Sequence, residues 1–242
     1  MSYRVVCISN RRPTEWYYCH DQFFKSLKGH EALVLGGGEM EYTGLSDKPR
    51  ILYKAIKDGL IKEDVIVFVD CWDLVFVSGV EEVIGEWEID GRPMIIGAER
   101  NCFPENFRKE YDAFLSHTTS FKYPNSGFII GRTEDFVTIL EAMDAENLPR
   151  DYFNGYTQTN YHFNDQAYYM DIFLRQPVFM ALDINCDYVL NMQEVQEGDI
   201  SFVKNGRIKV EETKTFPSII HWNGGSKDKW SREPILKHLN LL

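Results

Sequence analysis

A chain of 242 residues is long enough for one domain with a sizeable hydrophobic core and short for two. Hydrophobic residues make up 44% of it and charged residues 26%, which is typical of a globular protein. The formal net charge of −11 repels polyanions at long range, so we expect no nucleic-acid partner.

The first half of the chain alternates predicted strands and helices. Short runs rich in β-branched residues predict strands at residues 4–8, 32–35 and 65–69. Apolar residues at helical spacing predict a helix from Pro13 and Thr14, with Phe23, Phe24 and Leu27 on its buried face, and a second helix at residues 48–60. This alternation predicts a mostly parallel sheet.

The second half mixes further strands with two helices and a hairpin. We predict strands at residues 93–96, 128–130 and 218–221, and helices that begin at Thr133 and near Asn164, a good N-cap residue. The segment Lys204-Asn-Gly-Arg207 predicts a β-hairpin, because Asn-Gly suits a type I′ turn. The fold class is therefore α/β, a mixed and mostly parallel sheet flanked by helices, in a single domain over residues 1–242.

The cysteines and the N-terminal residues indicate the cellular compartment in which we expect the protein. The five cysteines are odd in number and include no CxxC pair, which favours a reducing environment. Residues 1–7 lack the apolar run of a signal peptide, and no stretch approaches the length of a membrane span. We expect a cytoplasmic enzyme with no membrane partner. The sequence is compatible with a homo-oligomer.

Two carboxylates, Asp70 and Asp73, directly follow the buried strand at residues 65–69. Open α/β sheets bind ligands at the carboxyl ends of their strands, and a buried carboxylate there needs a compensating cation. Mg²⁺ or Mn²⁺ bridging to phosphate oxygens would supply it. Trp72, between the two acids, can stack on a nucleobase or pack in the core. The simpler alternative for the acids is that they cap a loop after a strand.

A second polar segment, His221-Trp-Asn-Gly-Gly-Ser-Lys227, follows the last predicted strand. Glycines allow backbone N–H groups to approach phosphate oxygens, and the lysine adds a positive charge. We interpret His221 as a third metal ligand, against the alternative of a structural histidine. In Asn164-Asp165-Gln166, Asp165 can orient a sugar hydroxyl or act as a base, or it can simply complement the helix dipole.

Five short segments, in this order along nearly the whole chain, resemble the glycosyltransferase domain of the procollagen lysyl hydroxylase family. They are Asp70–Asp73, Ala98-Glu99 with Cys102-Phe103-Pro104, Asn125-Ser126-Gly127, Asn164-Asp165-Gln166 and His221–Lys227. The resemblance implies a GT-A (Rossmann-like) fold, Mn²⁺ with Mg²⁺ as the second choice, and a UDP-sugar donor. Two positions depart from the family pattern, since Asn164 replaces an acid and Phe103 replaces a tryptophan.

The resemblance also implies a role for individual residues. The metal ligands would be Asp70, Asp73 and His221. The nucleotide-sugar would be held by Ile8, Ser9, Asn10, Lys48, Asp70, Cys71, Trp72, Gly224, Gly225, Ser226 and Lys227, with the base on Trp72 and the diphosphate on the late loop. The catalytic residues would be Asp165 and its neighbour Asn164, near the anomeric carbon or the acceptor.

We therefore expect a metal-dependent transfer of glucose or galactose from a UDP-sugar to a hydroxyl acceptor, which is a hydroxylysine-type residue, a glycan or a small molecule. One alternative is a nucleotidyltransferase acting on a sugar phosphate. It would need a glycine-rich triphosphate loop near the first strand, and Asn10-Arg-Arg-Pro13 has no glycine. The other alternative is a non-catalytic nucleotide-sugar-binding protein, which would bind UDP without turnover.

Overall fold

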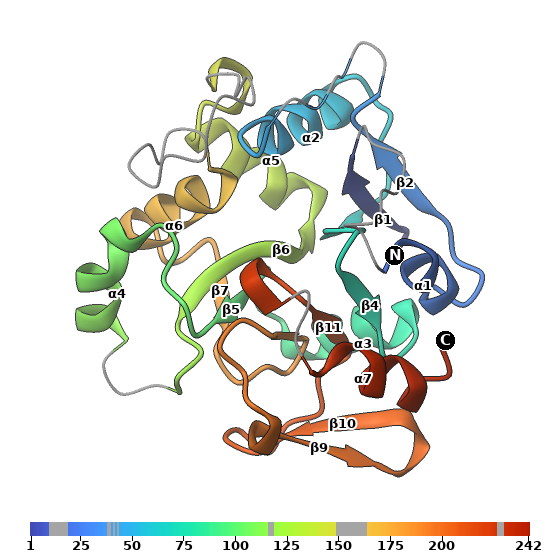
Figure 1. Ribbon diagram of the computed structural model, residues 1–242. Helices are drawn as coiled ribbons and strands as arrows, with labels where there is room; N and C mark the ends of the chain where they lie inside the picture. The colour runs from blue at the N-terminus through green and yellow to red at the C-terminus, as the bar shows by residue number, and fades with distance from the viewer. Residues whose placement is uncertain are drawn as a thin grey trace.

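The computed structural model describes residues 1–9, 19–37, 40, 42, 44–115, 119–148, 164–226 and 230–242. A six-stranded sheet in the order β2-β1-β3-β6-β5-β7 forms its centre (Figure 1). Its strands are β1 (Tyr3–Ile8), β2 (Ala32–Leu35), β3 (Val65–Val69), β5 (Met94–Glu99), β6 (Tyr123–Arg132) and β7 (Ala181–Asp183). All of these run in one direction except β6, which pairs antiparallel with both β3 and β5. The prediction of a mixed, mostly parallel sheet flanked by helices is confirmed.

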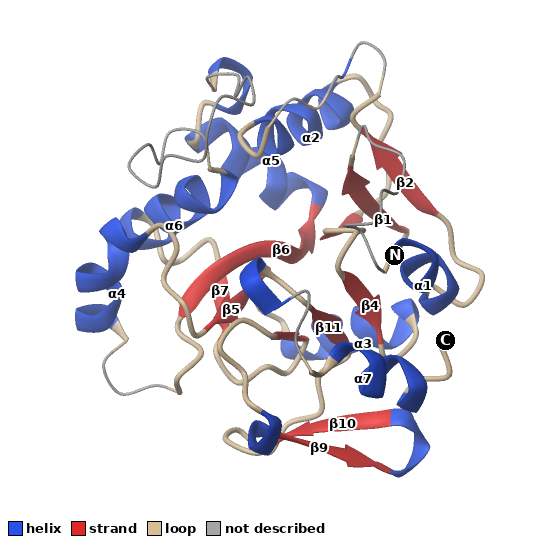
Figure 2. Ribbon diagram, in the orientation of Figure 1, coloured by secondary structure: helices blue, strands red, loops and turns tan. Residues whose placement is uncertain are grey.

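Helices cover both faces of this sheet (Figure 2). They are α1 (His20–Ser26), α2 (Asp47–Lys57), α3 (Val80–Asp90), α4 (Arg108–Phe114), α5 (Thr133–Ala142), α6 (Asp165–Arg175) and, near the C-terminus, α7 (Arg232–His238). Successive strand side chains point to opposite faces. Ile66 and Phe68 of β3 therefore pack with the α2, α5 and α6 side, while Val65, Val67 and Val69 pack with α1 and α3.

A second, three-stranded sheet in the order β4-β11-β8 lies beside the first. Its strands are β4 (Leu74–Phe76), β8 (Val189–Asn191) and β11 (Ile219–His221). Strand β11 pairs antiparallel with β4 and parallel with β8, which sets His221 opposite Leu74 on one side and Asn191 on the other. This pairing joins the chain just after residue 73 to the chain just before residue 222.

The predicted hairpin is formed by β9 (Ile200–Val203) and β10 (Arg207–Val210), at the lower edge of the molecule in Figure 1. Its turn residues, Asn205 and Gly206, both have positive φ, 68° and 72°. Positive φ at both central residues is the requirement of a type I′ turn, and Asn-Gly meets it. The predicted hairpin is confirmed, although Val203 pairs with Arg207 and the loop therefore holds three residues, 204–206.

Some predicted details are wrong. Helix α2 ends at Lys57 rather than at Leu60, whose side chain is exposed. Phe24 lies on the outer side of α1 and is exposed, whereas Phe23 and Leu27 are fully buried. The predicted helix start at Pro13 and Thr14 lies outside the described residues. Among the helices that the structure describes, none combines the length and the apolar character needed to cross a bilayer.

Candidate functional site

Asp70, Asp73 and His221 meet where the two sheets join. Asp70 directly follows β3, and its N–H donates to the Gly127 carbonyl (3.0 Å), while Asp73 precedes β4. The Trp222 N–H donates to the Asp73 carbonyl (2.7 Å), which fixes the end of β11 against the loop. The ligand atoms of the two acids and the histidine lie within 4.8 Å of one another. His221 Nε2 is 3.4 Å from Asp73 Oδ1 and 3.8 Å from Asp70 Oδ2.

Asn191 fixes the orientation and the tautomer of the His221 ring. Its side-chain Nδ2 donates to the Ala98 carbonyl at 2.8 Å, so its Oδ1 is the atom that faces His221. That oxygen lies 2.7 Å from His221 Nδ1 and can only accept, so Nδ1 carries the proton. Nε2 faces the two carboxylates, and it is buried without a hydrogen-bond partner.

Gly127 makes room for this ring. A Cβ atom at position 127 would lie 2.1 Å from His221 Cε1, which no real side chain tolerates. Gly127 belongs to a bulge of β6, because the pairing with β5 jumps from Ile96↔Ile129 to Gly97↔Asn125. Bulges commonly re-aim side chains beside functional sites. Here the bulge also carries Ser126, whose hydroxyl donates to Asp165 Oδ2 at 2.8 Å.

These contacts bear on whether the three residues fit a metal ion. Two carboxylate oxygens and an imidazole nitrogen face one another within 4.8 Å, and each of the three atoms can act as a metal ligand. Imidazole and carboxylate together suit Mn²⁺, and a ligating histidine is usually oriented by a hydrogen bond from its other nitrogen. The orphaned Nε2 and the Asn191 contact both match that pattern, so the donor set fits a divalent cation.

Lys48, predicted to help hold the nucleotide-sugar, is held between two carboxylates. Its Nζ donates to Asp70 Oδ1 at 2.6 Å and lies 3.6 Å from Asp165 Oδ2. Burial by itself would lower the pKa of Lys48, but Asp165 and Asp70 outweigh it and raise that pKa well above its usual value. The ammonium is therefore charged. It brings Asp165, on α6, into the same cluster as Asp70.

Glu99 is a buried residue to which the sequence assigned no role. Its Oε1 accepts hydrogen bonds from Asn125 (2.9 Å) and Gln166 (3.0 Å), and its Oε2 accepts one from Asn223 (2.7 Å). Burial raises the pKa of this carboxyl to about 7, although these hydrogen bonds oppose the shift. Glu99 thereby ties together β5, the β6 bulge, the start of α6 and the loop after β11. The only sequence signal was Ala98-Glu99 in the family resemblance.

The loop that follows β11 has an exposed tip and is held in place by hydrogen bonds to the protein. Gly224 and Gly225 are exposed, and Gly224 has a φ of 55°. The Gly225 N–H donates to Gln193 Oε1 (2.8 Å), and the buried Ser226 hydroxyl donates to the Asn223 carbonyl (2.6 Å). In this conformation, both polar groups bond within the protein rather than pointing outward.

The structure describes most of the remaining predicted residues. Ile8, Ser9 and Cys71 are buried near the ends of β1 and β3, and Trp72 is half-buried with its ring stacked on His20 at 4.9 Å between centroids. Asn164 caps α6, since its Oδ1 accepts from the Gln166 N–H at 2.9 Å, which confirms the predicted N-cap. Asn10 and Lys227 lie outside the described residues.

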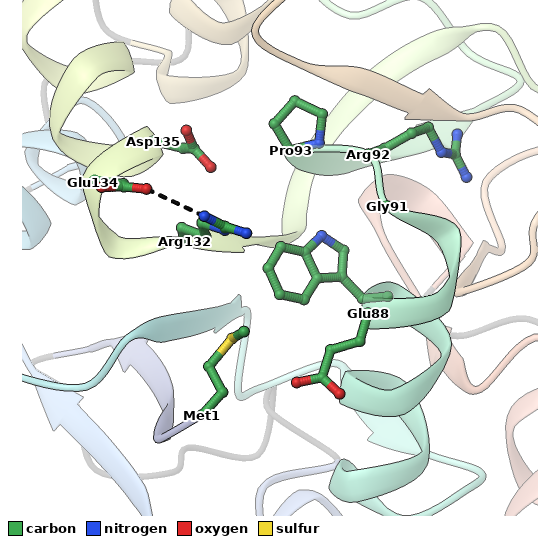
Figure 3. Close-up of a pocket in the computed structure, with 9 residues that line it drawn as sticks. Met1, Glu88, Gly91, Arg92, Pro93, Arg132, Glu134 and Asp135 are labelled. Carbon is green, nitrogen blue, oxygen red and sulfur yellow. Dashed lines mark hydrogen bonds and ion pairs between the residues drawn. The ribbon is translucent and has the colours of Figure 1, made fainter.

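A separate cavity of about 380 Å³ lies at the opposite end of the central strands (Figure 3). It is lined by Met1, Trp87, Glu88, Gly91, Arg92, Pro93, Arg132, Glu134 and Asp135. Two polar atoms of its lining residues, Trp87 Nε1 and Asp135 Oδ2, have no hydrogen-bond partner. Both atoms are buried and do not contact solvent. None of the candidate site residues lines this cavity, so we separate it from the site.

Comparison with known proteins agrees with this geometry. The family model described as "PLOD GT domain" matches residues 22–232. The mouse procollagen-lysine,2-oxoglutarate 5-dioxygenase 1 is 25% identical over 217 residues, which cover 85% of this chain and 28% of that protein. This chain thus spans less than a third of the length of that curated relative.

Two solved structures share the fold. Mouse xyloside xylosyltransferase 1, in its apo form, superposes with a TM-score of 0.54 at 12% identity, covering 93% of this chain and 99% of that one. A glycosyltransferase involved in the glycosylation of the major capsid of PBCV-1 gives a TM-score of 0.50 at 11% identity, covering 99% and 100%. At such identities the likeness establishes the fold and leaves the substrates to be argued from the site.

Proposed function

Because this chain belongs to the PLOD GT domain family and has a GT-A glycosyltransferase fold, we propose that it transfers glucose or galactose from a UDP-sugar to a hydroxyl acceptor with the help of a divalent cation. The observation that carries the proposal is the convergence of Asp70, Asp73 and His221, with the unpaired Nε2 of the histidine facing both acids. Mn²⁺ is our first choice and Mg²⁺ the second.

The protein's own residues would prepare the site for the donor. Asp70 Oδ2, Asp73 Oδ1 and His221 Nε2 would hold the cation, and Asn191 keeps the imidazole turned towards it. When bound, the cation would neutralise charge developing on the departing diphosphate. Trp72 would carry the uracil ring by stacking. The exposed Gly224 and Gly225, with Lys227, would lie along the diphosphate.

Asp165 is the carboxylate that we place nearest to the transferred sugar. It begins α6, is almost fully buried, and is held by the Ser126 hydroxyl and by Lys48. A carboxylate fixed in this way would orient a sugar hydroxyl or accept a proton from the acceptor. Asn164, beside it, serves as the helix cap and would keep the start of α6 in place. The acceptor is a hydroxyl of a hydroxylysine-type residue, a glycan or a small molecule.

The direct test is release of UDP. Purified protein with Mn²⁺ and UDP-glucose or UDP-galactose should release UDP slowly into water and faster with an accepted hydroxyl compound. Asp73→Asn should abolish the dependence of UDP binding on metal, because it removes one anionic ligand. Asp58→Asn, an exposed acid paired with Lys54, is the matched control and should behave as wild type. Failure of every UDP-sugar to bind, with and without Mn²⁺, would refute the proposal.

A further inference from the structure

The two oxygens of Asp70 face different partners. Oδ1 accepts a hydrogen bond from Lys48 Nζ at 2.6 Å, whereas Oδ2 faces His221 Nε2 at 3.8 Å. The ammonium of Lys48 is thus separated from the candidate cation position by a single carboxylate group. Its side chain is 9% exposed, so water screens its charge only weakly.

Without a metal, the four charged side chains of this cluster do not balance. Asp70, Asp73 and Asp165 contribute three negative charges, and Lys48 contributes one positive charge. A divalent cation would bring the sum to zero. If Lys48 were absent, Asp70 and Asp165 would both lose the ammonium that lies beside them, and an uncompensated buried charge is strongly destabilising.

We propose that Lys48 is a built-in counter-cation of the site: it stabilises the metal-free protein by neutralising Asp70 and Asp165, and thereby weakens and makes reversible the binding of the divalent ion. This inference rests on the proposed function, because it assumes that Asp70, Asp73 and His221 hold the ion. It assigns Lys48 to the carboxylates and not to the donor phosphates.

The sign of the effect on metal affinity follows from linkage. Removing Lys48 destabilises both the metal-free and the metal-bound protein. The loss is smaller when the metal is bound, since the ion itself compensates Asp70. Metal affinity is the difference between these two states, so it must increase. Removing the charge of Asp165 should lower the metal affinity. Lys48 would then pair with Asp70 alone, and the cluster would carry one negative charge fewer.

The test measures the dissociation constant of Mn²⁺ by titration calorimetry without nucleotide. We expect Lys48→Met to bind Mn²⁺ about tenfold more tightly than wild type, as expected for loss of one poorly screened like charge nearby. Asp165→Asn should bind it more weakly. Lys48→Arg keeps the charge and should stay close to wild type. Lys54→Met removes an exposed lysine of the same helix and is the matched control.

The double variant Lys48→Met/Asp165→Asn covers the case in which Lys48→Met does not fold. It removes both charges of the buried pair and leaves neither uncompensated. Our inference requires the double variant to bind Mn²⁺ more tightly than Asp165→Asn alone. Equal or weaker binding on loss of Lys48, in either background, overturns the counter-cation role and leaves metal binding by the wild type intact. Absence of Mn²⁺ binding in every variant, wild type included, overturns the metal site itself.

Discussion

The side-chain oxygen of Asn191 lies 2.7 Å from Nδ1 of His221, and its amide nitrogen is committed to the Ala98 carbonyl. A residue on β8 therefore decides which nitrogen of a histidine on β11 carries the proton. Replacing Asn191 with alanine should lower Mn²⁺ affinity by about 10- to 100-fold, the usual loss when the partner of a ligating histidine is removed. Calorimetry gives the affinity, and far-ultraviolet circular dichroism checks the fold.

The control for this variant is Asn185→Ala, an exposed asparagine on the segment just before β8. It should leave the Mn²⁺ affinity unchanged. If Asn191→Ala and Asn185→Ala bind Mn²⁺ equally well, the hydrogen bond between Asn191 and His221 does not orient a ligand, and His221 is a structural histidine.

Gly127→Ala tests the packing of the imidazole against β6. The added methyl group would overlap His221 Cε1, so the ring or the strand must move. We expect loss of Mn²⁺ binding and a lower free energy of unfolding, by about 1–3 kcal/mol as for other overpacked sites. Gly85→Ala in α3 is the matched control, because its methyl group would meet no atom within 4 Å. That change should stabilise the helix by up to about 1 kcal/mol.

Glu99 should make stability depend on pH. Burial raises the pKa of its carboxyl from 4.5 to about 7, so the folded protein binds a proton more readily than the unfolded chain. The resulting stabilisation is fully present below pH 4.5 and is lost as the pH rises through about 7. Denaturant unfolding of wild type and Glu99→Gln at several pH values should therefore diverge across this window, by on the order of 3 kcal/mol. Parallel pH profiles would contradict the shifted pKa.

Trp72 should contribute to nucleotide affinity and not to metal affinity. Loss of base stacking costs about 1–3 kcal/mol, so Trp72→Ala should weaken UDP binding at least several-fold while Mn²⁺ alone binds as before. Trp72→Phe should restore much of the UDP affinity, because it keeps a flat ring. His20, stacked on the Trp72 ring, offers a second variant, and His20→Ala should have a smaller effect on UDP affinity. A Trp72→Ala protein with unchanged UDP affinity would place the base elsewhere.

Much of the fold was predictable because the central strands and helices carry strong local patterns. Strand β3 is an unbroken run of β-branched and aromatic residues, and Asn205-Gly206 is a sequence typical of a hairpin turn. The outer strands of the small sheet were missed, since Leu74–Phe76 and Val189–Asn191 are too short to show any period, whereas its central strand β11 was predicted. The predicted start of strand β6 at Phe128 was five residues late. Pro124 and Gly127 are typical of a turn, whereas here they belong to a bulged strand.

The candidate site was predictable as a set of residues and not as a set of contacts. Asp70, Asp73 and His221 were grouped from separate motifs, and the structure brings them together. The sequence placed Lys48 at the site, but it did not indicate the contacts of Lys48 with Asp70 and Asp165. Ion pairs between α2, the end of β3 and the start of α6 depend on tertiary packing, which no local spacing reports. The role of Glu99 was missed for the same reason, since its three amide partners come from three distant segments.

The antiparallel pairing of β4 with β11 has a consequence for when the site forms during folding. The histidine of the site reaches the two aspartates only when residues 74–220 close into a loop, so the site requires two distant parts of the chain to pair. A bound divalent ion would then act as a cross-link between early and late parts of the chain, and clips that close long loops restrict the unfolded state most. The capacity to bind the ion would thus report that the early and late parts of the chain have paired.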